Sequence, residues 1–159
     1  MSNLKSDNML EKHYTPNELI EHMWKVLNEF HKEPITEFLE NSAGDGRMID
    51  FLKDKGYDVI AYDILNETHR EDITEANYLK VKLPYKKGRV AFINPPFAKA
   101  IKFIYKTLEE CDYCVSITGI TSFLNIDYDK YEVDTIDIFK NYNFGTASIS
   151  IAIIGIRKK

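Results

Sequence analysis

The sequence has few cysteines and no long apolar run, and each shortage argues against a class of protein. Only two cysteines, Cys111 and Cys114, occur among the 159 residues. A structural zinc site needs four ligands, and there is no second cysteine pair or histidine cluster to complete one. Packing in a core is therefore the favoured interpretation of both thiols. No apolar run approaches the roughly 20 residues of a transmembrane helix. We expect neither a metal site nor a membrane span.

Positive charge is also in short supply. The chain carries 21 lysines and arginines against 25 aspartates and glutamates, which gives a net charge of −4. This balance argues against a broad basic surface, so contact with nucleic acid would require a local basic patch. The first residues are polar and lack the apolar centre of a signal peptide, which predicts a cytoplasmic protein. We interpret residues 1–12 as a flexible tail and 13–159 as one globular domain.

The most informative segment is Asn94-Pro95-Pro96-Phe97. It follows the apolar run 89–93 and precedes residues 98–104, which have helical spacing, so it is predicted to be a tight loop between a strand and a helix. Two prolines stiffen the loop and leave carbonyl oxygens outside any hydrogen-bonded ladder. Asn94 adds an amide and Phe97 a flat ring. Such a loop suits a planar substrate with an exocyclic amine, and the alternative is a strand that ends at a proline turn.

A glycine-containing loop lies earlier in the chain. Residues 35–40 are predicted to form a strand, 41–46 a loop with Gly44 and Gly46, and 47–55 a helix. A strand, a glycine turn and a helix form a nucleotide-type crossover, in which glycine lets the backbone approach a ligand closely. The spacing is not G-x-G-x-x-G, and the lysine of a P-loop is missing.

Two further segments flank this loop. Asp63 ends the predicted strand 57–64, where an acid can accept hydrogen bonds from both ribose hydroxyls; the alternative is a turn residue. Upstream, Thr15 is a favourable helix cap, Pro16 fits the first helical position and Glu18 completes a capping box. The apolar spacing after Glu18 predicts an amphipathic helix, whose free N-terminus suits a carboxylate.

The remaining basic residues are divided by their expected position. Lysines are frequent in residues 74–88, but Lys86, Lys87 and Arg89 lead into a strand and should lie at the sheet edge opposite the ligand crevice. We interpret that stretch as a solvated face. Lys99 and Lys102 follow the proline loop and are better candidates for contacting phosphate. Downstream, a helix is predicted at 101–108, a strand at 112–117 and two β-rich runs at 133–139 and 147–156, joined by a loop at 140–146.

Taken in order, these segments resemble the S-adenosylmethionine-dependent N6-adenine methyltransferases. Residues 14–16 resemble motif X, 40–46 motif I, Asp63 motif II and 94–97 motif IV, and this order is similar to the gamma arrangement of the DNA enzymes. Asn41 stands where the family usually has proline. The resemblance implies a Rossmann-like class I methyltransferase fold of the α/β class, with about seven mostly parallel strands and an antiparallel last strand.

The resemblance also implies the roles of particular residues. Glu71-Asp72-Ile73 weakly resembles motif III, where the acid meets the cofactor adenine. The catalytic residues would be Asn94, Pro95, Pro96 and Phe97. Binding of the cofactor S-adenosylmethionine is assigned to Tyr14, Thr15, Pro16, Glu40, Ser42, Ala43, Gly44, Gly46, Asp63, Ile64, Asp72, Ile73 and Asn94. Target binding is assigned to Phe97, Lys99, Lys102, Phe123 and Asn143.

Enzymes of this family usually carry a target-recognition domain after the catalytic core. Here the predicted core uses the whole chain, so we expect no such domain within it. Transfer to adenine N6 in DNA is the main expectation. RNA adenine methylation, methylation of a protein glutamine and a non-catalytic cofactor-binding subunit remain alternatives. Reading a base sequence needs elements that enter a groove. We therefore expect weak sequence selectivity, or selectivity that depends on self-assembly or on a recognition subunit.

Overall fold

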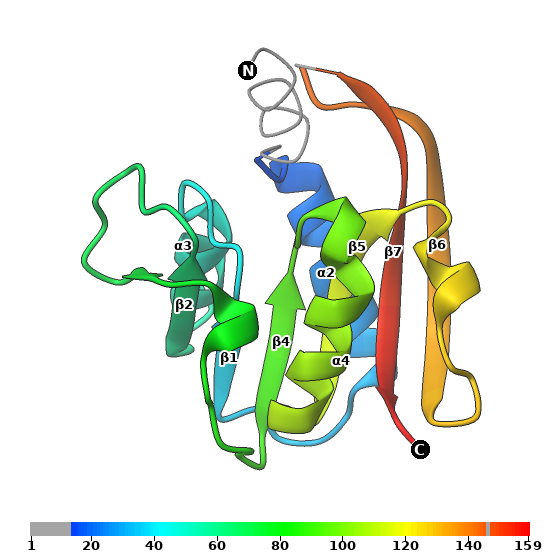
Figure 1. Cartoon of the computed structure of the whole chain (residues 1–159), viewed down its shortest axis with the longest axis horizontal. Coiled ribbons are helices and arrows are strands. Elements are labelled where there is room, and N and C mark those ends of the chain that lie inside the picture. Colours follow the sequence, from blue (N-terminus) through cyan, green and yellow to red (C-terminus); the bar gives the residue numbers. More distant parts are fainter. Residues whose placement is uncertain (1–13, 146) are drawn as a thin grey trace.

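The computed structural model describes residues 14–145 and 147–159, so the predicted tail 1–12 lies outside the described residues. Seven strands form one sheet in the order β3-β2-β1-β4-β5-β7-β6 (Figure 1). The strands are β1 (Glu37–Glu40), β2 (Val59–Asp63), β3 (Thr74–Glu75), β4 (Arg89–Ile93), β5 (Tyr113–Gly119), β6 (Tyr131–Asn143) and β7 (Ser148–Lys158). The helices are α2 (Asn17–Phe30), α3 (Arg47–Asp54) and α4 (Ala100–Glu110), with 3-10 turns η1 (Tyr78–Lys80), η2 (Phe97–Lys99) and η3 (Ser122–Asn125).

The pairing of the strands confirms the predicted sheet. Neighbouring strands from β3 to β5 are parallel, β7 pairs antiparallel with β5, and β6 pairs antiparallel with β7. The strand order reverses between β1 and β4, because the chain leaves β1 toward β2 on one side and returns to β4 on the other. In an open α/β sheet, that reversal creates a crevice at the carboxyl ends of the strands.

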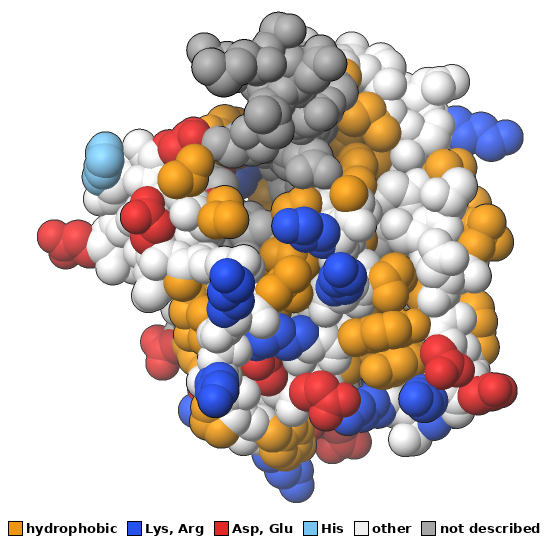
Figure 2. Space-filling model, in the orientation of Figure 1, with side chains coloured by type: hydrophobic (Ala, Val, Ile, Leu, Met, Phe, Trp, Pro, Cys, Tyr) orange, Lys and Arg blue, Asp and Glu red, His pale blue; other side chains and the backbone are white. Residues whose placement is uncertain are grey.

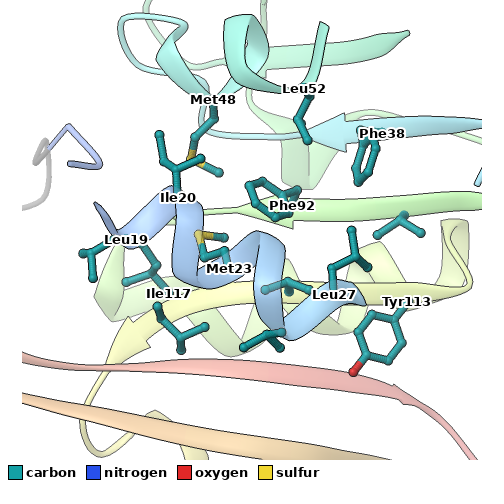
Figure 3. Packing of buried hydrophobic residues seen from close by; sticks show 14 of the residues in the cluster. Leu19, Ile20, Met23, Leu27, Phe38, Met48, Leu52, Phe92, Tyr113 and Ile117 are labelled. Atoms are coloured by element: carbon teal, nitrogen blue, oxygen red, sulfur yellow. The ribbon is translucent and has the colours of Figure 1, made fainter. Parts of the chain in front are cut away.

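Alternating side chains divide the core between the two faces of the sheet. In β4, Val90 and Phe92 point to one face, whereas Ala91 and Ile93 point to the other. The amphipathic helix α2 covers the first face, and Figure 3 shows its Met23 near Phe92, with Met48 reaching the same cluster from α3. On the second face, α4 and η1 pack over the sheet. Strands buried on both faces read as continuous apolar runs, which is why β4 and β5 were recognisable in the sequence.

The start of α2 differs from the prediction. Its N-cap is Pro16, without a side-chain cap, so the capping box predicted for Thr15 and Glu18 is wrong. The hydroxyl of Thr15 accepts a hydrogen bond from Asn94, and the carboxylate of Glu18 accepts one from the hydroxyl of Tyr142. Both side chains are recruited by distant segments, and such partners override a local capping preference.

The C-terminal hairpin is longer than predicted. Its strands extend through most of the predicted 140–146 loop, and the backbone N–H of Phe144 donates to the carbonyl of Ala147 to close the turn. Strand β5 ends at Gly119, which pairs with Ile151 of β7. The hairpin continues past this point, because β6 and β7 remain paired as far as Asn143 and Ser148. The polar stretch 74–88 holds the short strand β3 and η1, which lack a periodic apolar signal. Among the helices of the described residues, none is long and apolar enough to cross a bilayer.

Candidate active site

A cavity opens beside the carboxyl ends of β1, β2 and β4, at the reversal of strand order. Asn41 follows β1, Asp63 ends β2 and Asn94 follows β4, and all three line the cavity. The sheet thus gathers segments that are far apart in the sequence at its switch point. The lining residues are Tyr14, Thr15, Asn41, Ser42, Ala43, Gly44, Asp45, Arg47, Met48, Asp63, Ile64, Leu65, Glu67, Ala76, Asn77, Tyr78, Asn94, Pro96, Lys99 and Phe103.

Asp63 connects the glycine loop to the end of β2. One carboxylate oxygen accepts a hydrogen bond from the backbone N–H of Gly44 at 2.7 Å, and the other accepts from the N–H of Leu65 at 3.1 Å. These bonds hold the carboxylate in one orientation at the cavity wall. A carboxylate has about four acceptor sites, so Asp63 retains the capacity to accept further hydrogen bonds from a ligand.

The two glycines of the loop have different roles. Both have positive φ angles, +58° for Gly44 and +83° for Gly46. Gly44 lines the cavity, where a Cβ would meet the ring of Tyr14 at 3.2 Å. Gly46 does not line the cavity, and a Cβ there would lie 2.4 Å from the guanidinium of Arg70. Gly46, which the resemblance assigned to the cofactor, is therefore explained by backbone conformation and by the room that Arg70 requires.

Arg47 is a lining residue that the motifs did not identify. Its guanidinium pairs with Asp45 at 2.7 Å, donates to the carbonyl of Thr15 at 3.3 Å and lies 5.6 Å from the ring centre of Tyr14. Arg47 therefore joins the first turn of α3 to the segment before α2. Only a contact between residues that are 32 positions apart could show this role.

The loop after β4 is held from the same segment. The Asn94 side-chain nitrogen donates to the Thr15 hydroxyl at 2.9 Å, and Thr15 is only 4% exposed. The bond directs the nitrogen end of the Asn94 amide toward Thr15 and therefore sets the orientation of its oxygen end. Pro96 lines the cavity, Pro95 is buried, and the partly buried Phe97 lies against Gly119.

The predicted acid of motif III lies elsewhere. Asp72 forms ion pairs with Lys53 and Arg70 at 2.8 Å and does not line the cavity, while Ile73 is buried in a small core cluster. The hydrogen bonds from Arg70 lower the pKa of Asp72 far below its usual range. The structure therefore places both residues outside the cavity lining. Asn77, five residues after Asp72, does line the cavity, and its side-chain oxygen accepts from the N–H of Leu79 at 3.1 Å.

Several predicted target contacts also lie outside the cavity lining. Lys99 lines the cavity, but Lys102 lies further along α4. Phe123 belongs to η3 and packs on the core face beside α4. The side-chain oxygen of Asn143 accepts from the N–H of Gly145 at 2.7 Å, as expected of a turn residue. Pro16 and Glu40 do not line the cavity, but each is next in sequence to a residue that does, Thr15 and Asn41.

Glu40 is a fully buried acid at the end of β1. One of its oxygens accepts from the N–H of Ser42 at 2.9 Å, and the other has no hydrogen-bond partner among the described residues. Burial raises the pKa of Glu40 from 4.5 to about 8, and the nearby charge of Asp63 acts in the same direction. The folded protein therefore keeps this acid protonated at neutral pH.

Replacing Glu40 with glutamine should change how stability depends on pH. Glu40 stays protonated in the folded state up to about pH 8, but in the unfolded state it ionises near pH 4.5. The wild type thus loses stability as the pH rises through this window, by at most about 5 kcal/mol. Glu40→Gln does not titrate and should gain on the wild type over that range. Urea unfolding of both proteins from pH 4 to 9 tests this, and parallel stability curves would contradict it.

The cysteines show no features of a metal or redox centre. Cys111 and Cys114 are both buried and free, and burial raises the pKa of both thiols, that of Cys114 to about 12. Thiols that stay protonated at neutral pH are poor ligands and poor nucleophiles. In the part of the chain that the structure describes, no group of three or more histidines, cysteines or acids could hold a metal ion.

Comparison with known proteins places the fold. No protein-family model matches the sequence, and no curated protein matches it significantly. The solved 23S rRNA methyltransferase ErmE matches with a TM-score of 0.72 and 14% identity, over 91% of this chain and 69% of its own. A Pyrococcus horikoshii protein described as a candidate RNA methyltransferase gives 0.70 and 14%, over 91% and 85%. A dimethyladenosine transferase of Plasmodium falciparum gives 0.65 and 14%, over 91% and 62%.

Identities this low establish the shared fold and leave the substrate open. The likeness extends over nearly the whole described chain and agrees with the strand order and with the cavity at the strand reversal. The chain therefore has the α/β fold of the class I S-adenosylmethionine-dependent methyltransferases.

Proposed function

We propose that this protein transfers a methyl group from S-adenosylmethionine to the N6 amino group of adenine in RNA. The observation that carries the proposal is the placement of Asn94 and Pro96 on the wall of the cavity. Asn94 reaches this position with its side-chain nitrogen held by Thr15. A stiff loop of acceptors beside a nucleoside-type cavity is what transfer to an exocyclic amine requires.

The residues around the cavity fit the proposed cofactor. Asp63 presents an oriented carboxylate suited to the two ribose hydroxyls of S-adenosylmethionine. Gly44 keeps the loop free of a side chain where the backbone borders the cavity. Asn41, in the place of the usual proline, lines the cavity and has a buried side-chain nitrogen without a partner among the described residues. When bound, the cofactor would supply an electrophilic methyl group on a positively charged sulfur.

The protein's contribution to the reaction is then positioning and electrostatics. The lone pair of adenine N6 is delocalised into the ring, which makes the amine a poor nucleophile. In the proposed complex its N–H groups donate to the side-chain oxygen of Asn94 and the carbonyl of Pro95. These bonds retain electron density on nitrogen as it becomes tetrahedral, and the surplus proton finally passes to water. Bonds that strengthen toward the transition state raise kcat.

Thr15 should act on catalysis through Asn94. Thr15→Val keeps the shape of the buried side chain but removes the hydroxyl that accepts from the Asn94 nitrogen at 2.9 Å. Losing one neutral hydrogen bond costs about 1 kcal/mol, which corresponds to about a fivefold fall in kcat. Thr15→Ser should restore kcat, because it restores the acceptor. A fall in melting temperature with unchanged kcat for Thr15→Val would show a purely structural role.

RNA is favoured over the DNA substrate that the motifs predicted. The compared structures include a 23S rRNA methyltransferase and a dimethyladenosine transferase. The motif order alone pointed to DNA enzymes, but Asn-Pro-Pro-Phe also occurs in small RNA adenine methyltransferases. RNA-specific recognition commonly targets single-stranded loops whose bases are splayed out, so a separate domain for reading duplex grooves is not required.

The decisive experiment is transfer of a radiolabelled methyl group to four acceptors in parallel. Single-stranded RNA, single-stranded DNA, duplex DNA and protein are incubated with the full chain and labelled cofactor. We expect label in RNA, recovered as N6-methyladenosine after digestion. Label in duplex DNA alone would return the assignment to DNA. Cofactor binding without label in any acceptor would favour a non-catalytic subunit.

A further inference from the structure

Lysines follow one side of α4 as it leaves the cavity. Lys99 is the N-cap residue of α4, and Lys102 and Lys106 follow it within the helix at positions four apart, the spacing that places residues on one face of a helix. Lys99 lines the cavity at the start of this row. At 1.5 Å of rise per residue, the row covers about 10 Å of the helix. Positive charge thus extends from the cavity wall along the outside of the domain.

A second pair of lysines joins this row from another part of the chain. Tyr78 of η1 packs on Phe103 of α4 with ring centres 5.6 Å apart, and the ammonium of Lys106 lies 3.9 Å from the Tyr78 ring centre. Lys80 and Lys82 are two and four residues after Tyr78, and this packing brings them to the side of α4, where Leu79 and Val81 join the same core cluster. These two lysines thus lie beside α4, although the sequence placed the stretch 74–88 on a solvated face away from the crevice. Figure 2 shows blue side chains gathered on this face of the molecule, in front of α4 as drawn in Figure 1.

Four of these lysines pair with no acid in the described part of the chain. Lys80, Lys82, Lys99 and Lys102 are exposed, and none forms an ion pair with any described residue; we call these four the lysine face. Lys106, by contrast, pairs with Glu110. Lys82 shares a surface depression with Glu109 and Glu110, but these acids pair with Lys158 and Lys106. Unpaired positive charge on a chain with a net charge of −4 marks a local exception to its acidic balance. A surface of this kind suits an anionic partner.

We propose that the lysine face binds the sugar-phosphate backbone of a single-stranded RNA whose target adenine enters the cavity. The proposal rests on the proposed function and specifies how the RNA is held. Lys99 links the two, since it lies both in the cavity wall and in the lysine face. Lysine is a flexible point charge, so it can follow an irregular single strand without reading its sequence. The face therefore supplies affinity and direction, and leaves selectivity weak.

The salt dependence of RNA binding tests the lysine face. For single strands, log K falls with log salt with a slope of about −0.7 per phosphate neutralised. Lys80→Ala/Lys102→Ala removes two contacts outside the cavity lining and should reduce the size of the slope by about 1.4. The matched control is Lys25→Ala/Lys87→Ala, which removes the same charge from α2, on the other face of the sheet, and from the turn before β4. The control should keep the wild-type slope.

The salt titration distinguishes RNA binding by the lysine face from the alternatives. The probe is a fluorescent twelve-nucleotide single-stranded RNA containing adenine, with binding of the demethylated cofactor product measured as a check on the fold. Equal slopes for the two double variants would overturn the lysine face, while methyl transfer to RNA by the wild type would leave the proposed function standing. If Lys80→Ala/Lys102→Ala lost more binding to anionic phospholipid vesicles than to RNA, the four lysines would form a lipid-binding surface. That result would also overturn the proposed RNA contact. Absence of methyl transfer with the expected change in slope would instead count against the catalytic proposal.

Discussion

Asn94→Ala is expected to reduce the turnover of methyl transfer at least about 100-fold, by analogy with the loss of one preorganised polar group. Cofactor affinity should change little. The Asn94 oxygen would accept from the target amine, and this bond strengthens as the nitrogen becomes tetrahedral. Its loss should therefore lower kcat more than it raises KM. The measurement is single-turnover transfer to RNA, with calorimetry for the cofactor.

A double variant separates catalysis from packing at this position. Thr15 acts through Asn94 in the proposed mechanism, so Asn94→Ala/Thr15→Val should have nearly the same kcat as Asn94→Ala alone. Additive losses would show that Thr15 acts independently. Transfer by Asn94→Ala at the wild-type rate would refute this mechanism, because the Asn94 amide would then play no part in catalysis.

Asp63→Ala should weaken binding of S-adenosylmethionine and of its demethylated product about 10- to 100-fold. A charge-assisted hydrogen bond lost to a ligand costs about 1.5–3 kcal/mol. The carboxylate also holds the N–H groups of Gly44 and Leu65, so the alanine variant loses both the ligand contact and support for the loop. Calorimetric titration with the demethylated product measures the combined loss.

Asp63→Asn is the matched control for this variant. Its amide keeps one oxygen that can accept from a backbone N–H, but it loses the charge and an acceptor for ribose. An affinity between those of the wild type and Asp63→Ala is expected. Unchanged affinity in the alanine variant would remove Asp63 from the cofactor site. A lower melting temperature together with the same loss of affinity in Asp63→Asn as in Asp63→Ala would assign Asp63 to loop stability.

Local patterns in the sequence were sufficient for the scaffold. Strand β4, the proline loop and α4 follow one another directly, and the same holds for β1, the glycine loop and α3. Buried strands and amphipathic helices carry their periodicity within a few neighbouring residues, so their type and order can be read from the chain. The ends of parallel strands must then meet at one edge, which is why Asp63 and Asn94 could be assigned to one site.

Local sequence patterns could not predict contacts between residues that are far apart in the chain. The capping box at Thr15 satisfies every local rule, yet its hydroxyl binds Asn94, which is 79 residues away. Asp72 stands in a plausible motif but is held by Arg70 and Lys53. In each case a tertiary partner offered a stronger interaction than the local alternative, and only the packed structure brings such partners together.

The sequence by itself determined the α/β class, the order of the longer strands and helices without β3 and η1, and the chemistry of the loop with Asn94. Tertiary structure alone decided which residues share the cavity, so that Arg47 and Asn77 are included and Asp72 is not. It also assembled the lysine face, because Lys80 and Lys102 are too far apart in the chain to form a recognisable run. Charge acts through space and periodicity acts along the chain, so a dispersed basic surface becomes visible only after folding.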